Sequence, residues 1–182
     1  MKPVCIIGAG LAGSEAAWQL ASRGVPVRLV EMRPLKMTPA HTGGAFGELV
    51  CSNSLGADVL SSPAGILKSE LRKLGSLVMR AADHSSVPAG RALAVDRERF
   101  AGEITKVLEE HPLVEIVREE RSEIPSGPCI IATGPLTSGP MAESLRVLTG
   151  EEFLHFFDAV APVLTLESVD MGKAYKGSRY GQ

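Results

Sequence analysis

The 182-residue sequence predicts an α/β fold in which a parallel sheet is flanked by helices. Three observations predict it. Short runs of apolar residues recur along the chain, stretches with helical periodicity separate them, and a glycine-rich turn follows the first run. Because the runs are apolar throughout instead of alternating with polar residues, they are typical of strands buried on both faces of a parallel sheet.

The first two strands and the helix between them form a βαβ unit. We predict strands at Pro3–Ile7 and Val25–Val30, and a helix at Ser14–Arg23 that Gly24 ends. Residues 34–53 follow, rich in glycine and proline and without sustained periodicity. Long irregular segments in compact domains are more often functional than filler.

A second helix is expected to begin with Ser62 as N-cap and Pro63 at the first helical position. Its apolar residues share one helical face: Leu67, Leu71, Leu74 and Val78. Val87–Val95 is strand-like, and Asp96 can cap a third helix that Pro112 ends. The later elements are strands at Leu113–Val117 and Pro128–Ala132, a loop at Thr133–Pro140, and a helix at Met141–Leu148 closed by Gly150.

Composition and charge exclude several classes of protein. With 19 Lys and Arg against 21 Asp and Glu, the chain has no general attraction for nucleic acid or anionic membranes. No apolar run approaches the roughly 20 residues that span a bilayer. The N-terminus reads directly into a structural motif instead of a secretory signal, so we expect a cytoplasmic protein. Neither the cysteines nor the histidines have metal-ligand spacing, and no metal site is expected.

The turn after the first strand, Gly8-Ala9-Gly10-Leu11-Ala12-Gly13, matches the GxGxxG fingerprint of a dinucleotide-binding unit. Gly8 permits the tight turn, Gly10 lets the backbone approach a pyrophosphate, and Gly13 lets helix and strand pack closely. The pyrophosphate then lies at the positive end of the helix dipole. All six residues are therefore predicted to bind the cofactor of a Rossmann-type fold.

Glu31 ends the second strand, eighteen residues after Gly13, where a carboxylate accepts hydrogen bonds from adenosine ribose hydroxyls. An acid there favours a ribose without a 2′-phosphate, so FAD or NAD is expected instead of NADP. The strand before Thr133 and Gly134 runs into a glycine turn that resembles the "ATG" element of FAD proteins. Thr133 and Gly134 are therefore expected to approach the cofactor, and FAD is favoured.

Further segments resemble the TrmFO family, the folate- and FAD-dependent tRNA (uracil-5-)-methyltransferases. They run across essentially the whole chain and go well beyond the shared flavoprotein fingerprint. Besides Gly8–Gly13, the segments are Glu31-Met32-Arg33-Pro34, Glu48–Leu55, Val87–Gly90, Leu93–Arg97, Ala132–Ser138, Phe156–Ala159, Glu167–Met171 and Ser178–Tyr180.

The resemblance implies transfer of a one-carbon unit from methylenetetrahydrofolate to C5 of a T-loop uridine in tRNA. FAD reduced by NAD(P)H would supply the electrons, and the cofactor site would include Met32 and Arg33. Chains of this family are substantially longer, so the resemblance implies an N-terminal portion of such a protein. Residues 1–150 would then form an incomplete Rossmann-type FAD-binding domain, and residues 151–182 would begin an inserted second domain, with a strand at Ala161–Glu167.

Cys51 is the expected catalytic residue. C5 of uracil becomes nucleophilic once a thiolate adds to C6, and reduced flavin can deliver hydride to the resulting exocyclic methylene. By its place in the motif, Cys51 corresponds to the family's flavin-proximal cysteine. Its neighbours Ser52 and Asn53 are expected to hydrogen-bond the sulfur or the flavin ring. Attack on uracil, handling of a flavin-bound methylene, and a buried inert thiol all remain open as roles for Cys51.

Other residues have more than one interpretation. Glu48 either orients the flavin edge, acts as a base or is an ordinary exposed loop acid, and His41 is either a base or a structural histidine. Four cations of the second helix either hold tRNA phosphates or form its solvated face, which we favour; they are Lys68, Arg72, Lys73 and Arg80. The competing functions for the chain are a GidA-type tRNA-modifying flavoprotein and a non-catalytic FAD- or NAD-binding module.

Overall fold

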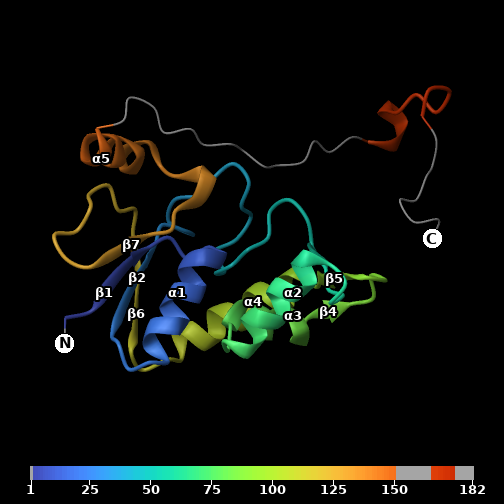
Figure 1. The fold of residues 1–182 in the computed structure, drawn as a ribbon. Helices are drawn as coiled ribbons and strands as arrows, with labels where there is room; N and C mark the ends of the chain where they lie inside the picture. Colours follow the sequence, from blue (N-terminus) through green and yellow to red (C-terminus); the bar gives the residue numbers. More distant parts are fainter. Residues whose placement is uncertain (1, 151–164, 175–182) are drawn as a thin grey trace.

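The computed structural model describes residues 2–150 and 165–174. A four-stranded parallel sheet in the order β6-β2-β1-β7 forms one part of the molecule (Figure 1). Its strands are β1 (Val4–Ile7), β2 (Val27–Glu31), β6 (Val114–Arg118) and β7 (Cys129–Ile131). The predicted α/β class with a parallel sheet is confirmed, and all four predicted strands of this sheet are present to within two residues at each end.

Two helices cover the sheet, and one lies beyond its end. Helix α1 (Leu11–Ala21) connects β1 to β2 and packs with α4 (Arg97–Glu109). The buried core contains Ile6 of β1 and Phe100 of α4. Helix α5 (Gly139–Thr149) follows β7 and lies beyond the carboxyl ends of the strands (Figure 1). Helices α1 and α5 therefore border the carboxyl ends of β1 and β2.

Residues 54–95 contain a second, antiparallel sheet that the sequence did not predict. It has the order β3-β5-β4, with β3 at Ser54–Ala57, β4 at Ser86–Val87 and β5 at Ala92–Val95. The single strand expected at Val87–Val95 was wrong, because the chain turns back between β4 and β5 and pairs Val87 with Ala94. Pro88 lacks a backbone donor and Gly90 has φ +62°, so these two residues favour a turn there.

The second predicted helix is two helices. Helix α2 (Pro63–Lys73) begins at its predicted cap, where Ser62 Oγ accepts from the N–H of Gly65 at 3.1 Å. It ends before Gly75, whose φ is +71°, and α3 (Leu77–His84) starts afresh with Ser76 as its own N-cap. The expected apolar face is wrong, since Leu67 and Leu74 are 55% and 64% exposed. The break at Gly75 separates Val78, which lies in α3, from the other three residues.

The buried side of α2 instead carries cations, which corrects the expectation of a solvated basic face. Lys68 is buried and its ammonium donates to the carbonyl oxygen of Ala57 at 3.0 Å. The guanidinium of Arg72 forms a bidentate pair with Asp58 and also contacts Asp83. These contacts hold α2 to β3 and α3, so Lys68 and Arg72 have structural roles.

The helix expected at Ser14–Arg23 instead spans Leu11–Ala21, with Ser22 and not Gly24 as its C-cap. Two other predicted helix ends are confirmed. Asp96 accepts from the N–H of Arg99 at 2.9 Å at the start of α4, and Gly150 closes α5 in the left-handed region. Of the strand expected at Ala161–Glu167, the first four residues lie outside the described residues, and Leu166–Ser168 is a 3-10 helix. The expected second domain at 151–182 also lies largely outside them.

Two features are absent from the part of the chain that the structure describes. No described helix is long and apolar enough to cross a bilayer. No three His, Cys, Asp or Glu side chains within residues 2–150 and 165–174 gather closely enough to hold a metal ion.

Candidate functional site

The glycines of the first turn differ in what surrounds them. Gly8 has φ +98°, and a Cβ there would lie 2.6 Å from the carbonyl oxygen of Ala132. A Cβ on Gly13 would lie 1.8 Å from the carbonyl oxygen of Gly8, so any side chain would force the helix away from the turn. A Cβ on Gly10 would meet no protein atom within 4 Å. The first and third glycines are required by protein packing, whereas the second faces open space.

The N-terminus of α1 faces the same space. Gly10 is the N-cap and supplies no side-chain cap, and the first backbone bond of the helix runs from the N–H of Ser14 to the carbonyl of Gly10. The amides of the first turn therefore have no partner within the helix. Together with the helix dipole, such amides favour an anion. Leu11 and Ala12, in this first turn, line a cavity.

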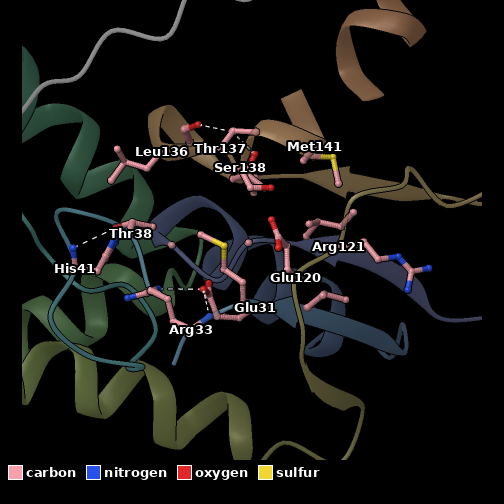
Figure 2. Close-up of a pocket in the computed structure, with 18 of the residues that line it drawn as sticks. Glu31, Arg33, Thr38, His41, Glu120, Arg121, Leu136, Thr137, Ser138 and Met141 are labelled. Atoms are coloured by element: carbon pink, nitrogen blue, oxygen red, sulfur yellow. Dashed lines mark hydrogen bonds and ion pairs between the residues drawn. The ribbon is translucent and has the colours of Figure 1, made fainter. Parts of the chain in front are cut away.

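This cavity has a volume of about 280 Å³ and lies at the carboxyl ends of the parallel strands. Figure 2 shows Leu136, Thr137 and Ser138 on one side of it and Glu31 and Arg33 on the opposite side. Of the predicted cofactor residues, nine line it: Gly8, Gly10, Leu11, Ala12, Glu31, Met32, Arg33, Thr133 and Gly134. Ala9 and Gly13 are buried behind the turn.

Glu31 is buried at the end of β2 and holds the glycine turn in place. Its Oε2 accepts from the N–H of Ala9 at 2.8 Å, and its Oε1 accepts from the N–H and Nε of Arg33, both at 3.0 Å. Burial acts to raise the pKa of Glu31, but the bonds from Arg33 and Ala9 outweigh it and lower the pKa below its ordinary value. A carboxylate offers about four acceptor sites, so one remains for a ligand hydroxyl.

Arg33 joins Glu31 to the irregular segment. Its Nη1 donates to Glu48 at 2.8 Å and to the carbonyl oxygen of Gly43 at 3.2 Å. Glu48 also accepts from the N–H and hydroxyl of Thr42 and from the N–H of Gly43. Glu48 is therefore the centre of a loop network, and with its side chain only 15% exposed the expectation of an exposed loop acid is wrong. Arg33 reaches the cavity as part of this network.

His41 borders the cavity and bonds within its own loop. Its Nδ1 lies 2.6 Å from the hydroxyl of Thr38 (Figure 2). Burial, followed by the positive charge of Arg33, lowers the pKa of His41 below its ordinary value. The lowered pKa favours the neutral ring, so His41 brings less positive charge to the cavity wall than an unshifted histidine would.

Sequence reasoning missed the wall opposite Glu31 and the residues after β6. Glu120 lines the cavity and receives a hydrogen bond from Lys36 Nζ at 2.7 Å, and Met141 of α5 is fully buried beside it. One signal could have found them, because ligands of open α/β sheets bind outside the carboxyl ends of the strands. The residues that follow β6 and β7 were candidates on that ground; they include Glu119, Glu120, Arg121, Pro135, Leu136, Thr137 and Ser138.

Cys51 directly follows a cavity residue in the chain, and the side chains of Ser52 and Asn53 form hydrogen bonds with other residues of the protein. Val50 lines the cavity, and Cys51 directly after it is exposed. Ser52 accepts from the N–H of Ser54 at 3.0 Å, and the Asn53 amide donates to the carbonyl oxygen of Val95 at 3.2 Å. Cys51 therefore lies one residue from the cavity lining, and hydrogen bonds tie Ser52 and Asn53 to residues of the antiparallel sheet.

These residues fit the diphosphate and ribose of a dinucleotide. The open space at Gly10, the amides of the first turn of α1 and the remaining acceptor site of Glu31 lie along one cavity wall. A helix N-terminus suits a diphosphate, and a carboxylate suits the ribose hydroxyls. The residues present at this wall are therefore chemically suited to a dinucleotide.

Comparisons with known proteins identify the family of the chain. The model of the family described as "Glucose inhibited division protein A" matches residues 3–182. A protein of Anoxybacillus flavithermus named "Methylenetetrahydrofolate--tRNA-(uracil-5-)-methyltransferase TrmFO" is 61% identical over 177 residues. A protein of the same name from Moorella thermoacetica is 59% identical over 180 residues. The chain covers 97% and 98% of its own length in these matches but 41% of each relative.

Solved structures show the same fold. GidA of Aquifex aeolicus in its form I crystal matches 73% of this chain and 25% of its own, with a TM-score of 0.56 and 21% identity. The form II crystal matches 69% and 21%, with a TM-score of 0.54 and 23% identity. The predicted Rossmann-type FAD-binding fold is thereby confirmed for the described sheet.

Proposed function

The chain belongs to the glucose inhibited division protein A family, and from that premise we propose that it binds FAD and serves in methylation of C5 of a uridine in tRNA. The observation that carries the proposal is the cavity itself, in which the glycine turn and Glu31 meet the loop that bears Cys51. Since the chain spans about two fifths of the TrmFO relatives, the activity is that of the protein as a whole.

The proposed one-carbon donor is methylenetetrahydrofolate, the reductant is NAD(P)H, and the substrate is a uridine of the tRNA T-loop. The name shared by the relatives supports the folate, the tRNA and the uracil C5 position. The proposed compartment is the cytoplasm, where tRNA and these co-substrates meet. When bound, reduced FAD supplies the hydride that converts the transferred one-carbon unit into a methyl group.

The fingerprint and Glu31 would hold the cofactor. Amides of the turn and of α1 donate to the diphosphate, and Glu31 accepts from the ribose. The cavity lining also supports Met32, Arg33, Thr133 and Gly134 as cofactor residues. Ser52 and Asn53 are also proposed to contact the flavin ring. Both side chains already form hydrogen bonds within the protein, so this contact needs a ligand that extends past Cys51.

Cys51 is the proposed nucleophile. Its thiolate adds to C6 of uracil, a C6–S bond forms, and the electron pair displaced to C5 attacks the methylene of the folate donor. C5 then loses its proton and the folate nitrogen leaves with the electron pair of its bond to the methylene, which leaves an exocyclic methylene on C5. Hydride addition to this methylene moves its electron pair to C5–C6 and expels the thiolate, so the product has a C5 methyl group and an intact C5–C6 double bond. Its exposure directly after Val50, which lines the cavity, supports this role.

Replacing Cys51 tests this role in the intact protein. Cys51→Ala should lower methyl transfer to a tRNA transcript by on the order of 10³-fold or more, as loss of a covalent nucleophile does. The flavin absorption spectrum should stay that of the wild type, because Cys51 lies outside the fingerprint. The matched control is Cys129→Ala in β7, which should retain activity. Turnover of Cys51→Ala near the wild-type rate would contradict the role, and a colourless wild-type protein would contradict FAD binding.

A GidA-type tRNA-modifying flavoprotein is the alternative that the family membership itself favours. The product separates the two, because the proposed reaction leaves a methyl group at uracil C5, which nucleoside analysis of the tRNA after the assay detects.

A further inference from the structure

Arg118, the last residue of β6, ties the irregular segment at residues 33–47 to the parallel sheet. Its Nη1 donates to the carbonyl oxygen of Arg33 at 2.7 Å and to that of Gly44 at 2.8 Å. Its guanidinium carbon lies 4.4 Å from the centroid of the Phe46 ring, which is fully buried. One cation therefore contacts the segment at its beginning and at two points near its end.

The contacts of Arg118 reach Glu31 through a single residue. Arg118 pairs with Glu31 in the register of β6 and β2. Arg33, whose carbonyl oxygen Arg118 holds, donates two hydrogen bonds to the Glu31 carboxylate, both at 3.0 Å. Glu31 in turn accepts from the N–H of Ala9 in the glycine turn. A displacement of Arg33 would therefore move the carboxylate that the proposed cofactor needs.

The same contacts reach the chain that leads to Cys51. Next to Phe46, the N–H of Gly47 donates to the carbonyl oxygen of Ala9 at 2.9 Å, so this end of the segment contacts the glycine turn. Val50 follows three residues later in the cavity lining, directly before Cys51. The position of Val50, and of the proposed nucleophile after it, therefore depends on how this end of the segment is held.

Arg118 itself lies outside the cavity lining that the described residues form. It contacts two carbonyl oxygens, an aromatic face and, at 3.5 Å, the carboxylate of Glu109. We propose that Arg118 is a positioning residue that holds Glu31 and the chain leading to Cys51 in the geometry that FAD binding and methyl transfer require. The inference rests on the proposed function and concerns the same site. A planar, permanently charged guanidinium suits this place, because it donates in its plane while its face covers a ring.

The test compares Arg118→Met with Arg28→Met in the intact protein. Arg28 is the matched control, because it also joins β2 to β6, through an exposed ion pair with Glu115. Flavin fluorescence measures the Kd for FAD, and methyl transfer to a tRNA transcript is measured with FAD at saturation, below the melting temperature of each variant. Arg118→Met should raise the Kd for FAD about tenfold, the effect of roughly one net hydrogen bond. It should also lower kcat about tenfold with KM for tRNA unchanged, because the reacting groups are misplaced.

Further variants and hydrogen exchange locate the effect. Arg118→Lys keeps a cation that can donate to both carbonyl oxygens, so it should recover most of the loss. Arg118→Gln should lose less than the methionine variant and extends the comparison to a polar side chain if that variant does not fold. Arg28→Met should match the wild type. In the cofactor-free protein, the amides of residues 38–48 should exchange faster in Arg118→Met, and those of β1 should exchange at the wild-type rate.

A purely structural role for Arg118 predicts a different result. The melting temperature of Arg118→Met would then fall, while its Kd for FAD and its kcat at saturating FAD would equal those of Arg28→Met. That outcome would overturn the inference and leave the proposed function intact. If the wild type binds FAD without methylating the tRNA, the proposed reaction fails, and the FAD affinities alone decide the role of Arg118. A wild type that does not bind FAD would contradict the proposed function and the inference with it.

Discussion

At the scale of single residues, a substitution of Gly10 tests ligand binding, and a substitution of Gly13 tests folding. A methyl group on Gly13 would overlap the carbonyl oxygen of Gly8, whereas one on Gly10 would enter the open space of the cavity. Gly10→Ala should therefore lower FAD affinity at least about tenfold and change the free energy of unfolding by less than about 1 kcal/mol. Gly13→Ala should lower the free energy of unfolding by about 1–3 kcal/mol, the usual cost of overpacking.

Flavin fluorescence titration and chemical unfolding of the cofactor-free protein measure the two effects. If Gly10→Ala binds FAD as tightly as the wild type, the diphosphate does not approach this turn. Equal destabilisation by both substitutions would also contradict the distinction, because Gly10 would then be a packing residue like Gly13.

The glycines and Glu31 were predictable because their roles follow from spacing along one short unit. The sequence placed Glu31 on the cavity wall but gave no sign that Arg33 and Ala9 share its carboxylate. The bond between Arg33 and Glu48 joins residues fifteen positions apart in an irregular segment. No periodicity marks such a contact, so sequence reasoning treated Glu48 as a loop acid.

At the scale of elements, one carboxylate holds the loop at residues 42–48. Glu48 accepts bonds from Thr42, Gly43 and Arg33, and its side chain is 15% exposed. Burial acts to raise its pKa, but the bonds from Thr42 and Gly43 and the charge of Arg33 outweigh it and lower the pKa below the ordinary 4.5. A lowered pKa means that the carboxylate stabilises the fold above pH 4.5 and that this contribution is lost as the pH falls through the folded-state pKa.

Glu48→Gln should therefore cost about 1–3 kcal/mol of unfolding free energy at pH 7. The gap from the wild type should shrink as the pH falls below 4.5, because a protonated Glu48 resembles glutamine in charge. Urea unfolding between pH 7 and pH 3.5 measures it, with exposed Glu70→Gln of α2 as the matched control. A gap that stays constant across this range, or one that equals that of Glu70→Gln, would contradict the role of Glu48.

Elements with local start and stop signals were predictable, and those without were not. Ser62, Asp96 and Gly150 mark helix ends by chemistry that acts within a few residues. The break between α2 and α3 was missed because apolar spacing continued through Gly75, although Ser76 is a good cap. In the structure Glu15 of α1 accepts from Ser76 and from the N–H of Val78, which fixes the start of α3 from another element.

At the scale of the whole molecule, the parallel sheet was predictable and the antiparallel one was not. Runs such as Val4–Ile7 are apolar enough to identify buried strands. Strand β3, Ser54–Ala57, contains no β-branched or aromatic residue, and it forms because β5 pairs with it. That pairing fixes the end of the loop that contains Val50 and Cys51. The arrangement of the site therefore depends on a contact that no local sequence pattern predicts.

The proposed function depends most on where the diphosphate of FAD lies. A crystal structure of the protein with FAD measures this directly. We expect diphosphate density over the turn at Gly10 and the first turn of α1, with a ribose hydroxyl within hydrogen-bond distance of Glu31. Density for the diphosphate elsewhere in the molecule, or a ribose that does not touch Glu31, would contradict the assignment of this cavity.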